Sequence, residues 1–317
     1  MRVLAAAALS VPLLACTADP PEKAPAREPQ TFDEESLDLY GVAPPPLNRE
    51  EMARARAELE RLLPGEGPLF SRFTEFQKRI LVPPGKLVAT VERALAECRR
   101  RTRELLELPD EESVELELVQ GAPWPAFARY LGNSRSVVQI NRDFPLTPAD
   151  ILEIASHEAY PGHHVLNVLR GEIEPPEGRE AFLHEGLAAY GVELVFPSDE
   201  RLRFEKEVLF PLAGLDAEEA ELASRVAQTV RRLAPLRVEA ARDYLEGRRD
   251  RVQSVLFLEN EALVPAPWAF LQFVDRYRTY VVAYTAGPAV IRSRIEESAS
   301  DPWEGYVRLL QEGIDET

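Results

Sequence analysis

Residues 157–164 read HEAYPGHH, and the proline and glycine inside this stretch constrain the fold more than any other feature of the chain. Ile154 and Ala155 lie on an apolar helical face before His157, so a helix leads into the motif. Pro161 has no N–H to bond to the carbonyl of His157, and its ring crowds that carbonyl. We therefore expect a kink or a local widening of the helix at this point.

The histidines of the motif have the wrong spacing for one regular metal-binding helix. In the H-E-x-x-H pattern two histidines lie four residues apart on one face, but the fourth residue after His157 is Pro161. On a regular helix His163 is about 120° out of phase with His157, while His164 is nearly in phase but about two turns away. A two-residue widening of the helix would bring His163 to the position that the second histidine has in the H-E-x-x-H pattern. Either histidine could complete the pair, and His163 is preferred over His164.

A second helix supplies further candidate ligands. The four histidines of the chain fall within 28 residues: His157, His163, His164 and His184. Zinc accepts imidazole and carboxylate ligands, and its catalytic sites use three protein ligands and a water. In FLHEGLAAYGVEL (182–194) Glu185 is best placed as the third ligand, and the preceding His184 is either a neighbour of the site or structural. Glu158 adjoins a ligand and can accept a proton from the attacking water.

HEAYPGHH followed by HEGLAAYGVEL resembles the bacterial family called domain of unknown function 885, whose hallmarks are an H-E-x-x-P-G-H-H stretch and a downstream E-G-x-A-x-Y helix. The likeness covers roughly residues 120–300. It implies a zincin-like metallopeptidase core that binds Zn²⁺ and hydrolyses peptide bonds. It also implies that His157, His163 and Glu185 hold the metal and that Glu158 is the base.

Two further features follow from this resemblance. Tyr284 and Gly287 match a Y-x-x-G element, so the Tyr284 phenol is a candidate catalytic group that hydrogen-bonds the oxyanion of a tetrahedral intermediate. The chain is also shorter than family members usually are, because its N-terminal helical part is small. Fewer covering helices predict a more open substrate cleft.

The N-terminus predicts export and a lipid anchor. Arg2 and a short apolar stretch fit a signal peptide, and LLAC (13–16) resembles a bacterial lipobox, which implies cleavage before Cys16 and acylation of its thiol. We expect a cell-envelope lipoprotein, facing the periplasm or in the outer membrane. The predicted segments are the signal peptide (1–15), the acylated cysteine with a Pro-rich tether (16–45) and one α-rich domain (46–317).

Composition limits the partners. The net charge of −17 argues against a nucleic-acid partner, which would need a basic surface to neutralise phosphates. The expected partners are a peptide or protein substrate and a membrane, reached through Cys16. No Gly-rich phosphate loop or serine-hydrolase motif is present in the sequence.

Hydrophobic periodicity predicts a mainly α fold with a small β-sheet. We expect helices at 49–63, 67–81, 86–108, 147–170, 177–195, 199–213, 216–247, 248–263, 266–283 and 285–297, and strands at 113–121 and 136–141. Thr147, Pro148 and Asp150 give the motif helix the start signals of a capping box. The strand at 136–141 either packs inside the sheet or pairs with an extended peptide by edge addition.

The function that these features predict is that of a zinc metallopeptidase. Two alternatives keep the metal site: a non-catalytic metal-binding lipoprotein, and a zinc amidase that acts on cell-wall material. Stoichiometric zinc without cleavage of any peptide would favour the first alternative. The chemistry of a zinc-activated water serves both the peptidase and the amidase, so sequence separates these two poorly.

Overall fold

The structure of the protein is a computed structural model that describes residues 30–44, 46–122, 124–171 and 176–312. The predicted signal peptide and Cys16 lie outside the described residues. Within those ranges, none of the helices combines the length and the apolar character needed to cross a membrane.

Helices dominate the described chain and a small sheet accompanies them, as the sequence predicts. The elements before the sheet are α1 (Phe32–Tyr40), α2 (Arg49–Leu62), α3 (Leu69–Arg79), the 3₁₀ turn η1 (Pro84–Lys86) and α4 (Leu87–Leu105). Those around the motif are α5 (Pro148–Glu158), α6 (His163–Arg170), α7 (Gly178–Val195), α8 (Ser198–Phe204), the π-turn η2 (Glu205–Leu209) and α9 (Phe210–Ala213). The remaining elements are α10 (Glu219–Arg231), α11 (Pro235–Leu245), α12 (Arg251–Asn260), α13 (Pro267–Tyr277), the 3₁₀ turn η3 (Arg278–Tyr280), α14 (Val281–Thr285), α15 (Gly287–Ser298) and α16 (Pro302–Glu312).

Several predicted helices are divided. The predicted helix 216–247 is two helices, because Pro235 cannot continue the hydrogen bonding of α10 and instead begins α11. The predicted helix 266–283 ends at Tyr277, since Arg278 has a φ of 49°. Helices α1 and α16 were not expected.

The sheet has three strands in the order β1-β3-β2, namely β1 (Ser113–Val119), β2 (Ala126–Gly132) and β3 (Arg135–Asn141). Strand β3 is parallel to β1 and antiparallel to β2. Edge addition to residues 136–141 is therefore wrong, because both sides of β3 are already paired. Strand β2 was missed. Its hairpin loop is Asn133-Ser134, with φ of 52° and 58°, the geometry that two-residue loops need but that Asn-Gly signals more clearly.

Helix α1 lies inside the segment predicted as tether. Thr31 begins it with a capping box and Gly41 ends it in the left-handed conformation. Phe32 and Tyr40 are buried, and the ring of Tyr40 stacks on that of Phe182 in α7. The packed domain therefore includes residues well before the predicted boundary at 46.

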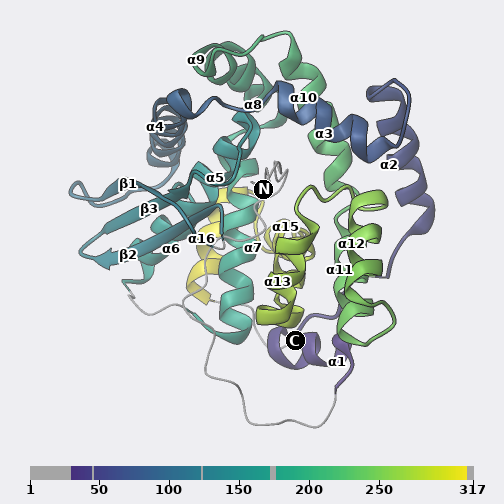
Figure 1. The fold of residues 1–317 in the computed structure, drawn as a ribbon. Helices are drawn as coiled ribbons and strands as arrows, with labels where there is room; N and C mark the ends of the chain where they lie inside the picture. Colours follow the sequence, from purple (N-terminus) through teal and green to yellow (C-terminus); the bar gives the residue numbers. More distant parts are fainter. Residues whose placement is uncertain (1–29, 45, 123, 172–175, 313–317) are drawn as a thin grey trace.

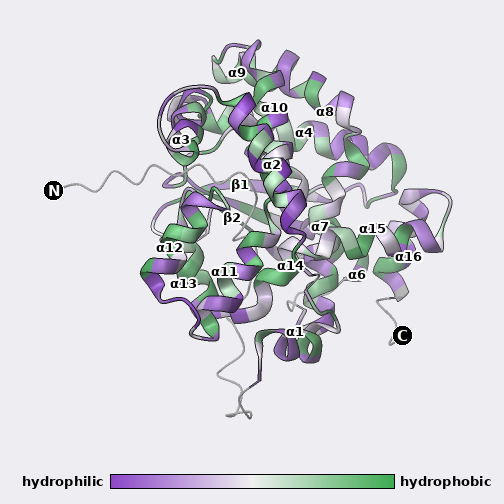
Figure 2. Cartoon of the chain, turned by 90° about the vertical axis from the view of Figure 1, so that its right-hand side faces the viewer, coloured by the Kyte–Doolittle hydropathy of each residue, from purple (hydrophilic) through white to green (hydrophobic). Residues whose placement is uncertain are grey.

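Helix α7 stands between the sheet and the bundle of later helices in the view of Figure 1. One large apolar cluster joins α4, the sheet and α5, and another joins α2, α3 and α10 to α14. Figure 2 shows hydrophilic and hydrophobic residues alternating along outer helices such as α2, α12 and α13, as amphipathic helices require. The motif helix α5 thus lies in the interior, in contact with α7.

Candidate metal centre

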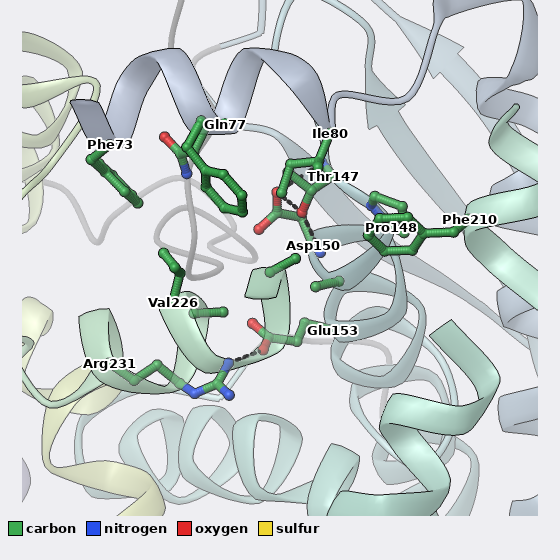
Figure 3. Close-up of a pocket in the computed structure, with 14 residues that line it drawn as sticks. Phe73, Gln77, Ile80, Thr147, Pro148, Asp150, Glu153, Phe210, Val226 and Arg231 are labelled. Atoms are coloured by element: carbon green, nitrogen blue, oxygen red, sulfur yellow. Dashed lines mark hydrogen bonds and ion pairs between the residues drawn. The ribbon is translucent and has the colours of Figure 1, made fainter. Parts of the chain in front are cut away.

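The helix that carries the motif is held firmly at its start. Thr147 and Asp150 form the capping box that the sequence predicts. Glu153 accepts hydrogen bonds from Arg201 at 2.8 Å and from Arg231 at 2.6 Å, and the contact with Arg231 is visible in Figure 3. These contacts tie α5 to α8 and α10, so the end of α5 that bears the motif has a defined position.

The turn between α5 and α6 is wider than a helical turn. The N–H of Tyr160 donates to the carbonyl of Ala155 at 3.2 Å, and the N–H of Gly162 donates to the carbonyl of Ser156 at 3.0 Å. These bonds span five and six residues, whereas an α-helical bond spans four. The break expected at Pro161 therefore occurs, and a new helix begins directly after it.

Glycine is required within this turn. A Cβ atom at Gly162 would lie 1.9 Å from the carbonyl oxygen of His157, far inside van der Waals contact. Across the interface, a Cβ atom at Gly191 of α7 would lie 2.9 Å from Cγ of Pro161. The bend and its packing against α7 thus both depend on positions without side chains.

Three donors meet where α5, α6 and α7 approach one another. Nε2 of His157 lies 3.1 Å from Nε2 of His163 and 3.3 Å from Oε2 of Glu185, and the distance from His163 Nε2 to Glu185 Oε1 is 3.7 Å. A tetrahedral zinc ion with bonds of about 2.0–2.1 Å separates neighbouring ligand atoms by about 3.3–3.4 Å. The donors therefore fit a metal ion, and this buried group could hold one.

Burial and charge act differently on the two glutamates near these donors. Burial disfavours the charged form of Glu185, but the charge of His163 and hydrogen bonds from His157 and His163 outweigh it and lower the pKa of Glu185 to about 2. Burial raises the pKa of Glu158 to about 8, with His163 opposing the rise and Glu185 adding to it. Glu158 is 0% exposed and neither of its oxygens has a well-formed hydrogen bond within the described chain. The backbone of Ala128 on β2 is the one hydrogen-bonding group that acts on its pKa, and a buried carboxyl group with so few partners is costly unless it serves a function.

The second histidine of the pair, His164, points elsewhere. Its Nδ1 lies 2.7 Å from Oγ of Ser136 on β3, and its Nε2 lies 3.1 Å from Oε2 of Glu112. The structure thus places His163 with the donors and His164 in a separate polar network.

A tyrosine that sequence reasoning missed reaches the donors. The hydroxyl of Tyr280 donates to Oε1 of Glu185 at 3.2 Å. Tyr284, the predicted catalytic residue, lies one helical turn further on, with its ring edge-on to that of Tyr280 at 5.7 Å. The two tyrosines are four residues apart, but only Tyr284 matches the Y-x-x-G element, so no pattern in the sequence indicated Tyr280.

The glycine of the predicted Y-x-x-G element sets how closely α15 approaches α7. A Cβ atom at Gly287 would lie 3.2 Å from Cα of Gly186, the residue directly after Glu185. Two glycines therefore face each other at this crossing. The close approach brings the segment that carries Tyr280 against the helix that carries Glu185.

His184 is a neighbour of the centre that joins two helices. Burial and the charges of His163 and Arg170 lower the pKa of His184 to about 3, so its ring is neutral. Its Nε2 lies 3.3 Å from Nη1 of Arg170 at the end of α6. The side chain thus connects α6 with α7 beside the donors.

The donors are enclosed. The exposed fractions of His157, His163 and Glu185 are only 1%, 5% and 2%. A cavity of about 30 Å³ lies at the start of α5, between Thr147, Asp150 and Gln77 (labelled in Figure 3), and none of the donors lines it.

No protein-family model matches the chain, and no curated protein does. Among solved structures it is similar to a protein from Colwellia psychrerythraea described as a “putative lipoprotein”, with a TM-score of 0.60 and 15% sequence identity. The match covers 89% of this chain and 52% of the other, so the chain spans about half the length of that protein. At this identity the likeness shows a shared fold alone.

Proposed function

We propose that the protein is a zinc-dependent metallopeptidase with a zincin-like core, held in the cell envelope by a lipid on Cys16. The observation that carries the proposal is the meeting of two imidazole nitrogens and a carboxylate next to the buried carboxyl group of Glu158. The resemblance of the motif to the domain of unknown function 885 family supports it. The lipobox and the description of the neighbour from Colwellia psychrerythraea support the lipid anchor.

Each residue of the centre has a chemical role in this proposal. A bound zinc ion supplies Lewis-acid chemistry, since it lowers the pKa of a water and polarises a carbonyl. His157, His163 and Glu185 hold the ion. Glu158 takes a proton from the attacking water at a carboxylate oxygen and passes it to the leaving amine. Tyr280 orients Glu185 through the hydrogen bond to Oε1.

Elemental analysis tests the metal. Purified mature protein should contain about one zinc per chain, because catalytic sites with three protein ligands hold a single ion. Two histidines and a carboxylate also suit iron(II), so the measurement must cover both metals. We expect His157→Ala and Glu185→Ala to lose most of the metal, whereas Glu193→Gln, at a surface position of α7, keeps it. Full metal content in both ligand variants would disprove the site.

Cleavage of a peptide library tests the reaction. Glu158→Gln removes the base but no ligand, so it should keep the zinc and lower the rate by about 10²–10⁴-fold. Glu193→Gln again serves as the control and should cleave at the wild-type rate. A fully active Glu158→Gln variant would show that Glu158 is not the base.

The burial of the donors favours one alternative, a metal-binding lipoprotein without activity. It predicts stoichiometric zinc and no cleavage of any peptide. A zinc amidase of the cell wall would instead leave peptides intact and release products from purified cell-wall material. The same preparations, assayed on both substrates, separate the three functions.

A further inference from the structure

A single buried carboxylate collects hydrogen bonds from both sides of the turn between α5 and α6. The side chain of Glu112, just before β1, is 0% exposed. It accepts hydrogen bonds from Arg99 Nε at 2.7 Å and Arg103 Nη1 at 2.8 Å, both on α4. It also accepts from the hydroxyl of Tyr160 at 2.7 Å and faces Nε2 of His164 at 3.1 Å. Arginine pairs of this kind hold a carboxylate in a fixed place.

Two of these partners enclose the break. Tyr160 directly precedes Pro161, and His164 is the second residue after Gly162. Their rings pack edge-on at 5.2 Å, and Ser136 of β3 engages the other nitrogen of the His164 ring. The residues of the turn cannot make the regular bonds of a helix, so side-chain contacts must define its shape. Glu112 thus ties the end of the turn at Tyr160 to the start of α6.

This geometry bears directly on the metal centre. His163 lies next to His164 in the first turn of α6, and any shift or rotation of that turn moves its Nε2 away from His157. We propose that Glu112 is a positioning residue of the metal centre: it fixes the wide turn through Tyr160 and His164, and so holds His163 in register with His157. The inference rests on the metal centre of the proposed function, and it does not require that the protein cleave peptides.

Zinc affinity, measured by competition with a fluorescent chelator, tests the inference. Glu112→Gln weakens the contacts at the turn, and we expect its dissociation constant for zinc to rise about 10- to 100-fold, as for supporting residues of other metal sites. The matched control is Glu97→Gln. Glu97 is also buried and bonded to arginines of α4, namely Arg100 at 2.7 Å and Arg101 at 2.9 Å, and its side-chain hydrogen bonds all go to α4. It should lose a similar amount of thermal stability and keep the wild-type zinc affinity.

A pair of substitutions at His164 separates positioning from folding. His164→Gln carries an amide N–H to the place of Nε2 and should restore most of the zinc affinity that His164→Ala loses. Tyr160→Phe, which removes one hydroxyl, should weaken zinc binding by a smaller factor while the protein stays folded.

The outcomes of these measurements are distinct. If Glu112→Gln and Tyr160→Phe bind zinc as tightly as the wild type, or if Glu97→Gln weakens binding as much as Glu112→Gln does, the positioning role is wrong. If the wild type binds zinc but cleaves nothing, the proposed peptidase function fails while the affinity series still decides the role of Glu112.

Discussion

At the scale of single residues, two neighbouring carboxylates are driven toward different protonation states. The pKa of Glu185 is lowered to about 2, because His163 and His157 outweigh its burial, whereas burial raises that of Glu158 to about 8. Opposite shifts in adjacent groups are typical of sites with an acid–base role. At neutral pH Glu185 therefore carries a charge and Glu158 keeps its proton, and a cation held by the donors would favour the charged form of Glu158.

Substitutions at the two tyrosines near these carboxylates should change different quantities, zinc affinity for one and kcat for the other. Tyr280→Phe removes the hydrogen bond to Glu185, so we expect zinc affinity to fall several-fold, measured by chelator competition. If Tyr284 contacts the oxyanion, as the sequence resemblance implies, Tyr284→Phe lowers kcat and leaves zinc affinity unchanged. Tyr244→Phe, which removes a surface hydrogen bond to Asp275, is the control and should alter neither quantity. Unchanged zinc affinity in Tyr280→Phe would contradict the orienting role.

Sequence reasoning reached the donors because they are close along the chain and lie on recognisable helices. Pro161 and Gly162 predicted a bend that could bring His163 to the position of the second ligand, and they left His164 as the alternative. Glu112 could not be found in this way, since it is one of several acidic residues in PDEESVELEL and lies far from the motif in sequence. Its role depends on tertiary contacts with Tyr160 that no local pattern contains.

At the scale of elements, helix α5 begins with a buried acid, Asp150. The burial of this acid destabilises the folded protein by an amount that depends on pH. Burial raises the pKa of Asp150 from 3.8 to about 7, although hydrogen bonds from Thr147 oppose the rise. Between these values the folded protein keeps a proton that the unfolded chain has released. The folded state binds more protons, so its stability falls as the pH rises through this window.

Asp150→Asn tests this link between α5 and pH. Asparagine stays neutral and its side-chain oxygen can still accept the bonds from Thr147, so the variant should lose less stability between pH 4 and 7 than the wild type does. Urea unfolding at several pH values measures the difference. Asp199→Asn, at an exposed position of α8, controls for the change in net charge. Parallel stability curves for wild type and Asp150→Asn would contradict the shift.

Two of the elements that the sequence did not predict, β2 and α1, were missed for the same physical reason. Strand β2 contains Ala126 and Ala128, which have low strand propensity, and β2 is specified by its pairing with β3 instead. Helix α1 follows a Pro-rich stretch, and its amphipathic pattern is interrupted by acidic residues. In both, tertiary contacts decide a structure that local preference leaves open.

At the scale of the whole molecule, helix α1 links the N-terminal part of the domain to the region of the centre. The ring of Tyr40 contacts Phe182 of α7 and lies 5.8 Å from the ring of Tyr280. Glu35 accepts hydrogen bonds from Arg278 at 2.7 and 2.9 Å, two residues before Tyr280. Residues from the first and the last quarter of the chain therefore enclose the same helix.

Tyr40→Ala should show how much the contacts of α1 contribute to the stability of the folded protein. Removing a buried aromatic ring leaves a cavity, and we expect the free energy of unfolding to fall by about 3 kcal/mol. Leu37 on the same helix is 53% exposed, so Leu37→Ala should change it by less than about 0.5 kcal/mol. Chemical denaturation measures both. Equal effects of the two substitutions would show that α1 is not part of the cooperative core.

The requirement for glycine at position 162 also predicts how related sequences can vary. Since a Cβ atom there would meet the carbonyl oxygen of His157 at 1.9 Å, the six-residue separation of His157 and His163 cannot survive any larger residue at Gly162. A descendant that loses this glycine must either delete two residues and return to a regular helix or abandon the site. Residue identity at 162 and histidine spacing should therefore change together among relatives.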